Sequence, residues 1–198
     1  MTKSFVHLHA HTEYSMLDGA AKIVDYLKKV KELNQPAAAI TDHGNLYGAM
    51  EFVQKANDLG IKPIIGYEAY ITPGSRFDRP DRENNKRYHL TLLAENNIGY
   101  QNLVELVSKA YTEGYYYKPR IDYELLDQHC DGLIALSGCL GGELAQHLAP
   151  DGSVEEGNTS NERSFEKALD IAKKYQSIFG KENYFIERRG GEVERQYY

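Results

Sequence analysis

The stretch His7-Leu8-His9-Ala10-His11 carries three histidines at alternate positions. In an extended segment, side chains two residues apart point to the same side, so His9 and His11 can converge on one ion. Imidazole suits Zn, Mn, Fe and Ni, and carboxylate partners can bridge two metals. A single histidine is most often a surface or hydrogen-bonded side chain, but three in alternation favour metal binding. We therefore predict that His9 and His11 are metal ligands.

Three more ligand-type side chains lie in or just beyond apolar runs. His43 follows Ala37–Thr41, where the neighbouring Asp42 could orient an imidazole. Glu68 lies inside an apolar run. A carboxylate there is costly unless it is paired, bound to metal, or exposed to water at the rim of a barrel. Cys139 lies in a Gly-rich turn and is equally a metal-binding thiolate or a small buried residue.

Two candidates stay open on local sequence alone. Asp18 is equally a ligand or a turn residue. His89 opens its apolar run instead of ending it, so in a parallel sheet it would lie at the wrong end. Cys130, His129 and His147 lack such context, and we expect them to be structural or surface residues.

Short apolar runs alternate with helical periods along the chain. The runs predict strands at Phe5–Leu8, Ala37–Thr41, Ile61–Ile71, His89–Leu93, Leu133–Leu136 and Tyr184–Glu187. Helical spacing predicts helices at Ala21–Leu33, from about Met50 to Gly60, around Leu103–Ala110 and at Phe165–Phe179. Repeated strand–helix units predict parallel strands, hence an α/β sheet or βα barrel. Both folds gather functional residues at the carboxyl ends of their strands.

Two polar segments carry basic and aromatic side chains. Thr72–Arg87 is predicted to be a solvated loop, in which Asp and Glu dilute the charge of Arg76, Arg79, Arg82, Lys86 and Arg87. Tyr115–Arg120 could stack on single-stranded nucleic acid, although packing between elements is the commoner role of such a segment.

Composition limits the class of protein. The chain has 198 residues with 23 Lys+Arg and 29 Asp+Glu, a net charge of −6 and two Cys. The cysteines suit a reducing cytosol and predict a cytoplasmic protein, and no run is long enough to span a membrane. The acidic balance argues against gripping nucleic acid by charge alone, but not against a metal-dependent nucleic-acid enzyme.

The ordered set of motifs resembles one known family, the PHP (polymerase and histidinol phosphatase) family, over residues 5–187. Stretches outside the ligand positions resemble the branch found in bacterial replicative DNA polymerases. The resemblance implies a distorted, TIM-barrel-like βα barrel with up to three divalent metals, Zn, Mn or Fe. It maps the ligands onto His9, His11, Asp18, His43, Glu68, His89 and Cys139, with Asp42 and His7 expected behind them.

The implied chemistry is hydrolysis of a phosphate ester by a metal-activated water, with no nucleophile from the protein. In a replicative polymerase this is 3′→5′ exonuclease proofreading of a DNA 3′ end, with the other polymerase subunits as partners. Two alternatives stay open: a non-catalytic domain that contacts partner subunits, and a free-standing phosphatase.

The sequence departs from the family pattern toward its C-terminus. The family closes its site with a later Asp-x-His pair, and none follows Cys139. We therefore expect a partial PHP domain over residues 1–187, a divergent tail over 188–198, and a barrel incomplete at its C-terminal end. We expect no polymerase active site in this chain and weak hydrolysis at most from the chain alone.

Overall fold

The computed structural model describes residues 5–16, 18–148 and 162–187, so the tail expected at 188–198 lies outside the described residues. The strands are β1 (Ala37–Ile40), β2 (Lys62–Ile71), β3 (Tyr88–Ala94), β4 (Arg120–Ile121), β5 (Leu133–Leu136) and β6 (Tyr184–Phe185). A 3₁₀ turn, η1 (Glu13–Ser15), precedes the helices α1 (Ile23–Glu32), α2 (Ala49–Asp58), α3 (Asn97–Thr112), α4 (Tyr123–Gln128), α5 (Glu143–Leu148) and α6 (Glu162–Phe179).

The strands form one sheet in the order β1-β2-β3-β5-β6, and β4 extends it beside the end of β2. Parallel pairs join β1 to β2, β2 to β4, and β5 to β6. In the part of the chain that the structure describes, β1 and β6 end the order and do not pair. The expected α/β fold with an unclosed barrel is therefore confirmed.

Strand β3 corrects the prediction of parallel strands, because it runs antiparallel to both β2 and β5. No helix lies between β2 and β3, and the chain returns through residues 72–87 directly to the neighbouring position. A direct return of this kind makes an antiparallel pair, whereas a parallel pair needs a longer crossover, usually through a helix.

The strand predicted at Phe5–Leu8 is also not formed. The N-terminal segment instead follows β1 loosely, through hydrogen bonds from Ala39 N–H to the His7 carbonyl and from Thr41 N–H to the Ala10 carbonyl. Two such contacts are too few for a regular ladder, yet they hold the histidine segment beside the end of β1.

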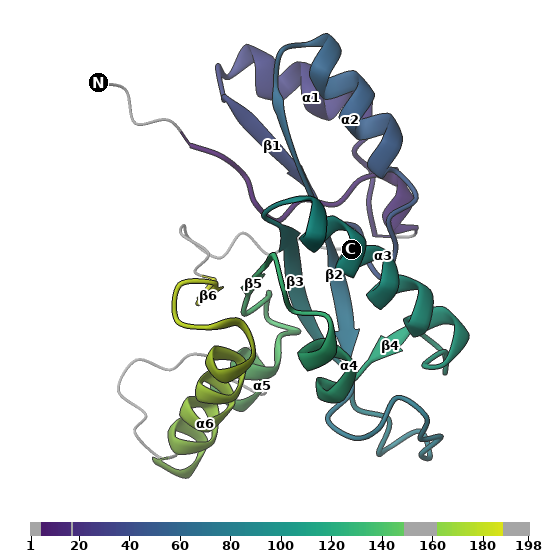
Figure 1. Ribbon diagram of the computed structural model, residues 1–198, viewed down its shortest axis with the longest axis vertical. Coiled ribbons are helices and arrows are strands. Elements are labelled where there is room, and N and C mark those ends of the chain that lie inside the picture. The colour runs from purple at the N-terminus through teal and green to yellow at the C-terminus, as the bar shows by residue number, and fades with distance from the viewer. Residues whose placement is uncertain (1–4, 17, 149–161, 188–198) are drawn as a thin grey trace.

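The described residues form two apolar cores. Helices α1 and α2 pack with β1 at one end of the molecule, around Ile23, Leu27 and Phe52 (Figure 1). The larger core joins α3, α4 and α6 to β2, β3 and β5. No helix among the described residues is long and apolar enough to cross a membrane.

The basic loop over residues 72–87 is only partly solvated, and the prediction is wrong for Arg76. That side chain is buried, with its Nη1 3.0 Å from Asp122 and its Nε 2.6 Å from Glu113. Arg120 is fully buried as well and donates to the carbonyl of Asp78. Long-range partners thus fix this loop against β4 and α3.

Gly99 lets α3 approach the turn before β5. A Cβ at this position would lie 1.8 Å from the carbonyl oxygen of Gly132. We expect Gly99→Ala to lower the free energy of unfolding by about 1–3 kcal/mol, measured by urea denaturation. The exposed change Gln101→Ala on the same helix should stay within about 0.5 kcal/mol, and equal stability of the two variants would contradict this packing.

Candidate metal centre

The structure brings all seven predicted ligands into one cluster. His9 and His11 come from the segment before η1, Asp18 from the loop before α1, His43 from the end of β1, Glu68 from β2, His89 from β3 and Cys139 from the turn after β5.

Glu68 lies at the centre of the cluster and is completely buried. Its Oε1 is 3.2 Å from His9 Nε2 and 3.1 Å from His89 Nδ1. Its Oε2 is 3.6 Å from His11 Nε2 and 2.5 Å from His43 Nδ1. The carboxylate therefore belongs to two groups of convergent ligand atoms, one with His9 and His11 and one with His43 and His89.

Several of these buried atoms contact only one another. Among the described residues, the polar contacts of His9 Nε2, His43 Nδ1 and Glu68 Oε2 are with imidazole and carboxylate atoms of the cluster itself. A tetrahedral ion with bonds of about 2.1 Å spaces its ligands about 3.4 Å apart, and the Nε2 atoms of His9 and His11 lie 3.2 and 3.6 Å from Glu68 oxygens. The imidazole and carboxylate donors therefore fit divalent metal ions.

Two further side chains extend the cluster at opposite edges. Asp18 Oδ2 lies 2.5 Å from His43 Nε2. Cys139 Sγ lies 3.4 Å from His89 Nδ1 and 3.6 Å from Glu68 Oε1. The Gly141 N–H donates to this sulfur over 3.3 Å.

Backbone pairing places the two central ligands side by side. Glu68 N–H donates to the Asp42 carbonyl, and Gly44 N–H donates to the Glu68 carbonyl. His43 thereby forms a parallel bridge with Glu68 just beyond β1. The antiparallel direction of β3 resolves the conflict over His89, because the start of β3 pairs with Tyr70 at the carboxyl end of β2.

The Gly-rich turn after β5 fits closely around His89. Gly138 has a φ of 82°, in the left-handed region, and a Cβ there would lie 2.7 Å from the His89 carbonyl oxygen. The His89 N–H donates to the Gly141 carbonyl over 2.9 Å. Gly138 and Gly141 therefore fix the position of Cys139, which lies between them in the sequence.

Asp42 contacts the cluster through a serine. The buried carboxylate accepts hydrogen bonds from Thr12 N–H and from the hydroxyls of Thr12 and Ser15. Ser15 Oγ in turn lies 3.1 Å from His11 Nδ1, which leaves His11 Nε2 facing Glu68. The structure does not bring His7 into the cluster, because that side chain is exposed.

Glu187, directly after β6, is a site residue that the sequence reasoning missed. Its Oε1 lies 2.9 Å from His9 Nδ1, and its own N–H donates to Ser137 Oγ. A carboxylate on one ring nitrogen fixes the tautomer of a histidine and aims the other nitrogen at a metal. No local signal marks this contact, since 178 positions separate the two residues in the sequence.

We expect Glu187→Gln to weaken metal binding by about 10- to 100-fold, because the amide leaves His9 less firmly oriented and less basic. Isothermal titration calorimetry with Zn²⁺ or Mn²⁺ measures the change. Glu182→Gln, an exposed change just before β6, is the matched control. Unchanged affinity in the Glu187 variant would show that this contact does not position His9.

Two histidines hold protons strongly in the metal-free cluster. Burial opposes the charge of His9, but its hydrogen bonds to Glu187 and Glu68 outweigh it and raise the pKa of His9 to about 9. Burial also opposes the charge of His89, but hydrogen bonds with Cys139 and Glu68 outweigh it and raise the pKa of His89 to about 10. Both imidazoles are therefore cations at neutral pH until a metal displaces their protons.

The pKa values of the other two shifted groups in the cluster, His11 and Glu68, are lowered. Burial, aided by the charge of His43, lowers the pKa of His11 to about 4. Burial opposes ionisation of Glu68, but hydrogen bonds from His43, His89 and His9 hold its pKa well below its usual range. The carboxylate is thus charged, and its negative charge is balanced by neighbouring imidazolium groups.

These pKa values predict how the stability of the metal-free chain depends on pH. The raised values contribute stability that is complete below about pH 6.5 and is lost as pH rises through about 9 and 10. We expect a fall of about 2 kcal/mol or more between pH 7 and pH 10, measured by urea unfolding in EDTA. His89→Gln should flatten this profile and His129→Gln should not. Equal slopes in both variants would contradict the prediction.

Comparison with known proteins agrees with the sequence and the site. The profile of the family described as PHP domain matches residues 7–189. A DNA polymerase III subunit alpha from Thermus aquaticus is 59% identical over 151 residues, which cover 74% of this chain and 12% of that protein. Those from Treponema pallidum and Helicobacter pylori strain 26695 are 50% and 45% identical, and the matches cover 93% and 98% of this chain.

The chain spans only 12% to 16% of the length of these relatives. A solved structure of a putative metal-dependent phosphoesterase from Bifidobacterium adolescentis has 11% identity and a TM-score of 0.48, over 84% of this chain and 74% of that one. This weak likeness adds nothing to the match of the family profile over residues 7–189. On that match, the chain belongs to the PHP domain family.

Proposed function

We propose that this chain is the N-terminal PHP domain of a bacterial DNA polymerase III alpha subunit and that it hydrolyses DNA from the 3′ end. The convergence of buried imidazole and carboxylate atoms around Glu68 is the observation that carries the catalytic part of this proposal. The identity of its relatives as polymerase subunits supports the DNA substrate. The reaction is 3′→5′ exonuclease proofreading during replication.

The metal ions are up to three of Zn²⁺, Mn²⁺ or Fe²⁺, a choice supported by the mixture of imidazole, carboxylate and thiolate donors. The residues that would hold them are His9, His11, Asp18, His43, Glu68, His89 and Cys139. When bound, such ions supply positive charge beside phosphate oxygens and lower the pKa of a water molecule toward neutrality.

The protein's own part is to orient the ligands. Glu187 holds His9, and Ser15 holds His11, so that in each ring Nε2 faces Glu68. We propose no side-chain nucleophile, because the Ser137 hydroxyl is engaged with the Glu187 N–H and has no histidine base among its contacts in the described residues. Water is the nucleophile in this proposal.

The partners follow from the same assignment. We propose that the domain contacts the DNA 3′ end and the other subunits of the polymerase III holoenzyme, in the bacterial cytoplasm. The relatives are described as subunits of that polymerase, which supports this setting.

A single-turnover assay tests the function, since we expect weak hydrolysis from this chain alone. Metal-loaded protein in excess over 5′-labelled single-stranded DNA should shorten the DNA from its 3′ end. EDTA or the change His11→Asn should stop the reaction. Hydrolysis of p-nitrophenyl phosphate without any DNA shortening would support a free-standing phosphatase instead. A chain that holds its metals and cleaves neither substrate would support a non-catalytic domain.

A further inference from the structure

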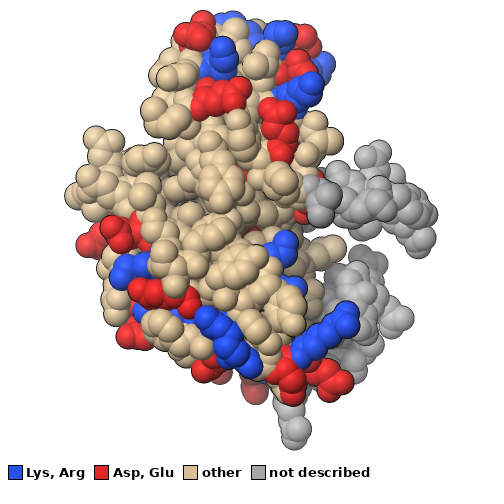
Figure 2. Space-filling view, turned by 90° about the vertical axis from the view of Figure 1, so that its right-hand side faces the viewer, with Lys and Arg blue, Asp and Glu red and all other residues tan. Residues whose placement is uncertain are grey.

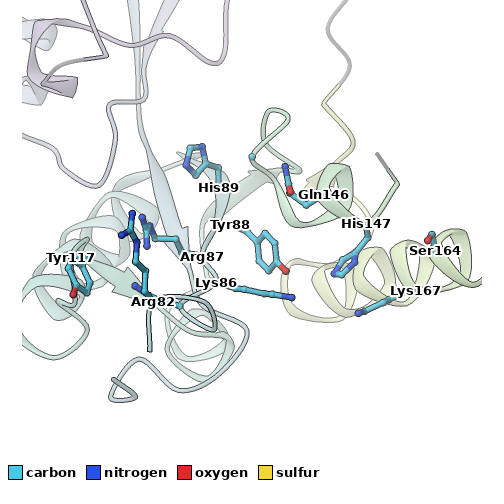
Figure 3. A pocket seen from close by; sticks show the side chains of 12 residues that line it. Arg82, Lys86, Arg87, Tyr88, His89, Tyr117, Gln146, His147, Ser164 and Lys167 are labelled. Carbon is cyan, nitrogen blue, oxygen red and sulfur yellow. The ribbon is translucent and has the colours of Figure 1, made fainter. Parts of the chain in front are cut away.

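A basic cavity adjoins the metal cluster (Figure 3). It has a volume of about 1110 Å³ and is lined by the end of the loop before β3, Tyr117, the turn after β5, and residues of α5 and α6. Arg82, Arg87 and Tyr117 lie on one side of it, His147 and Lys167 lie on the other, and Lys86 extends between them (Figure 3).

The lining carries positive charge without compensation. Arg82, Lys86, Arg87 and Lys167 are exposed, and no Asp or Glu is among the described residues that line the cavity. None of the four cations is part of an ion pair within the described residues. The Asp and Glu residues of the preceding loop are not part of this lining.

The charge of the cavity lining differs in sign from the net charge of the chain. The net charge of the chain is −6, and on the face in Figure 2 basic and acidic side chains are interspersed at both ends. At the cavity, burial together with Lys167 lowers the pKa of His147. A cavity of one sign in an acidic protein concentrates a ligand of the opposite sign.

His89 joins the cavity to the metal cluster. It lines the cavity, while its Nδ1 lies 3.1 Å from Glu68 Oε1 in the cluster. Gly141 also lines the cavity and accepts the His89 N–H. A phosphate held at the cluster would therefore have its neighbouring phosphates beside these cations.

Size and aromatic content point to a strand instead of a single small phosphate. Pockets for one drug-sized ligand measure about 300–1,000 Å³, and this cavity exceeds that range. Tyr117 is 68% exposed, at the tip of a turn closed by the Tyr116 N–H and the Lys118 carbonyl. An exposed ring beside a basic groove is the usual arrangement for binding single-stranded nucleic acid.

We propose that this basic cavity binds the phosphodiester backbone of a single DNA strand whose 3′ end lies at the metal cluster. The inference rests on the proposed function for the position of the 3′ end. The cations neutralise successive phosphates, Tyr117 stacks on a base, and His89 marks the end of the path.

Binding without cleavage tests the cavity by itself. In EDTA, fluorescence anisotropy with 5′-fluorescein oligothymidylate compares the wild-type chain, Lys86→Gln/Arg87→Gln, and the control Lys28→Gln/Lys55→Gln on α1 and α2. We expect about tenfold weaker binding for the cavity variant, and a salt slope smaller by about 1.4, at about 0.7 for each phosphate contact. Circular dichroism and the thermal midpoint check that both variants fold.

Two results would overturn the inference: equal binding by the cavity and control variants, or full competition by inorganic phosphate equimolar with the DNA phosphates. Hydrolysis of p-nitrophenyl phosphate by the metal-loaded variants separates this inference from the proposed function. We expect it to be equal in the Lys28→Gln/Lys55→Gln control and the wild type, because neither substitution lies at the cluster or in the cavity. If the metal-loaded wild type did not hydrolyse p-nitrophenyl phosphate, the proposed metal chemistry would be contradicted. The anisotropy comparison would still test whether the cavity binds DNA.

Discussion

Replacing Glu68 by Gln is expected to abolish tight binding of divalent metal ions. Glu68 is the one side chain shared by both groups of ligand atoms, and it is completely buried. The amide removes the negative charge, and its nitrogen cannot accept a metal. The loss should exceed the roughly 10- to 100-fold effect typical of residues behind the ligands. Isothermal titration calorimetry with Zn²⁺ or Mn²⁺ measures it.

Glu143→Gln is the matched control for this experiment. Glu143 is also a buried glutamate, but its carboxylate accepts hydrogen bonds from Tyr123 and Tyr175 and belongs to neither group of convergent ligand atoms. We expect the Glu143 variant to bind metal like the wild type. If the Glu68 variant bound metal as tightly as this control, Glu68 would not be the central ligand.

Replacing Arg76 by Met is expected to destabilise the fold by about 3–5 kcal/mol, because it strips a buried carboxylate of its counter-charge. Asp122 is 3% exposed. Its carboxylate accepts hydrogen bonds from the Arg76 backbone N–H and from Arg76 Nη1, and it caps α4 by accepting the Leu125 N–H. Urea denaturation gives the change in the free energy of unfolding.

A second variant separates the lost ion pair from lost packing. Arg76→Met/Asp122→Asn removes the uncompensated charge but keeps the oxygen that caps α4, so we expect it to recover part of the loss. Arg79→Met, in the exposed part of the same loop, should cost about 1 kcal/mol or less. If the double variant were no more stable than Arg76→Met, the buried charge would not be the cause.

His9, His11, His43 and Glu68 could be proposed as ligands from local sequence because they lie in or beside apolar runs, whereas Asp18, His89 and Cys139 joined the set only through the resemblance to the PHP family. Their convergence then followed from the rule that strand ends gather functional residues. His89 was the exception, and the structure places it correctly only because β3 is antiparallel. A signal for this existed: residues 72–87 lack helical periodicity, and the crossover between parallel strands usually passes through a helix.

Other features depend on contacts that a local pattern does not contain. Glu187 reaches His9 across 178 positions, and Arg76 reaches Asp122 across 46, so the burial of these charges could not be predicted. The unpredicted helices α4 and α5 have six residues each, too few to establish a period of 3.6. Strand Leu133–Leu136, which is short but wholly apolar, was predicted with its observed bounds.

The central claim is that Glu68 and its surrounding histidines form a centre for divalent metal ions. Crystals of the chain soaked with Mn²⁺ or Zn²⁺, measured at the absorption edge of the metal, test it most directly. The account predicts anomalous peaks in contact with Glu68, one beside His9 and His11 and one beside His43 and His89. Fully soaked crystals with no anomalous peak at Glu68 would contradict it.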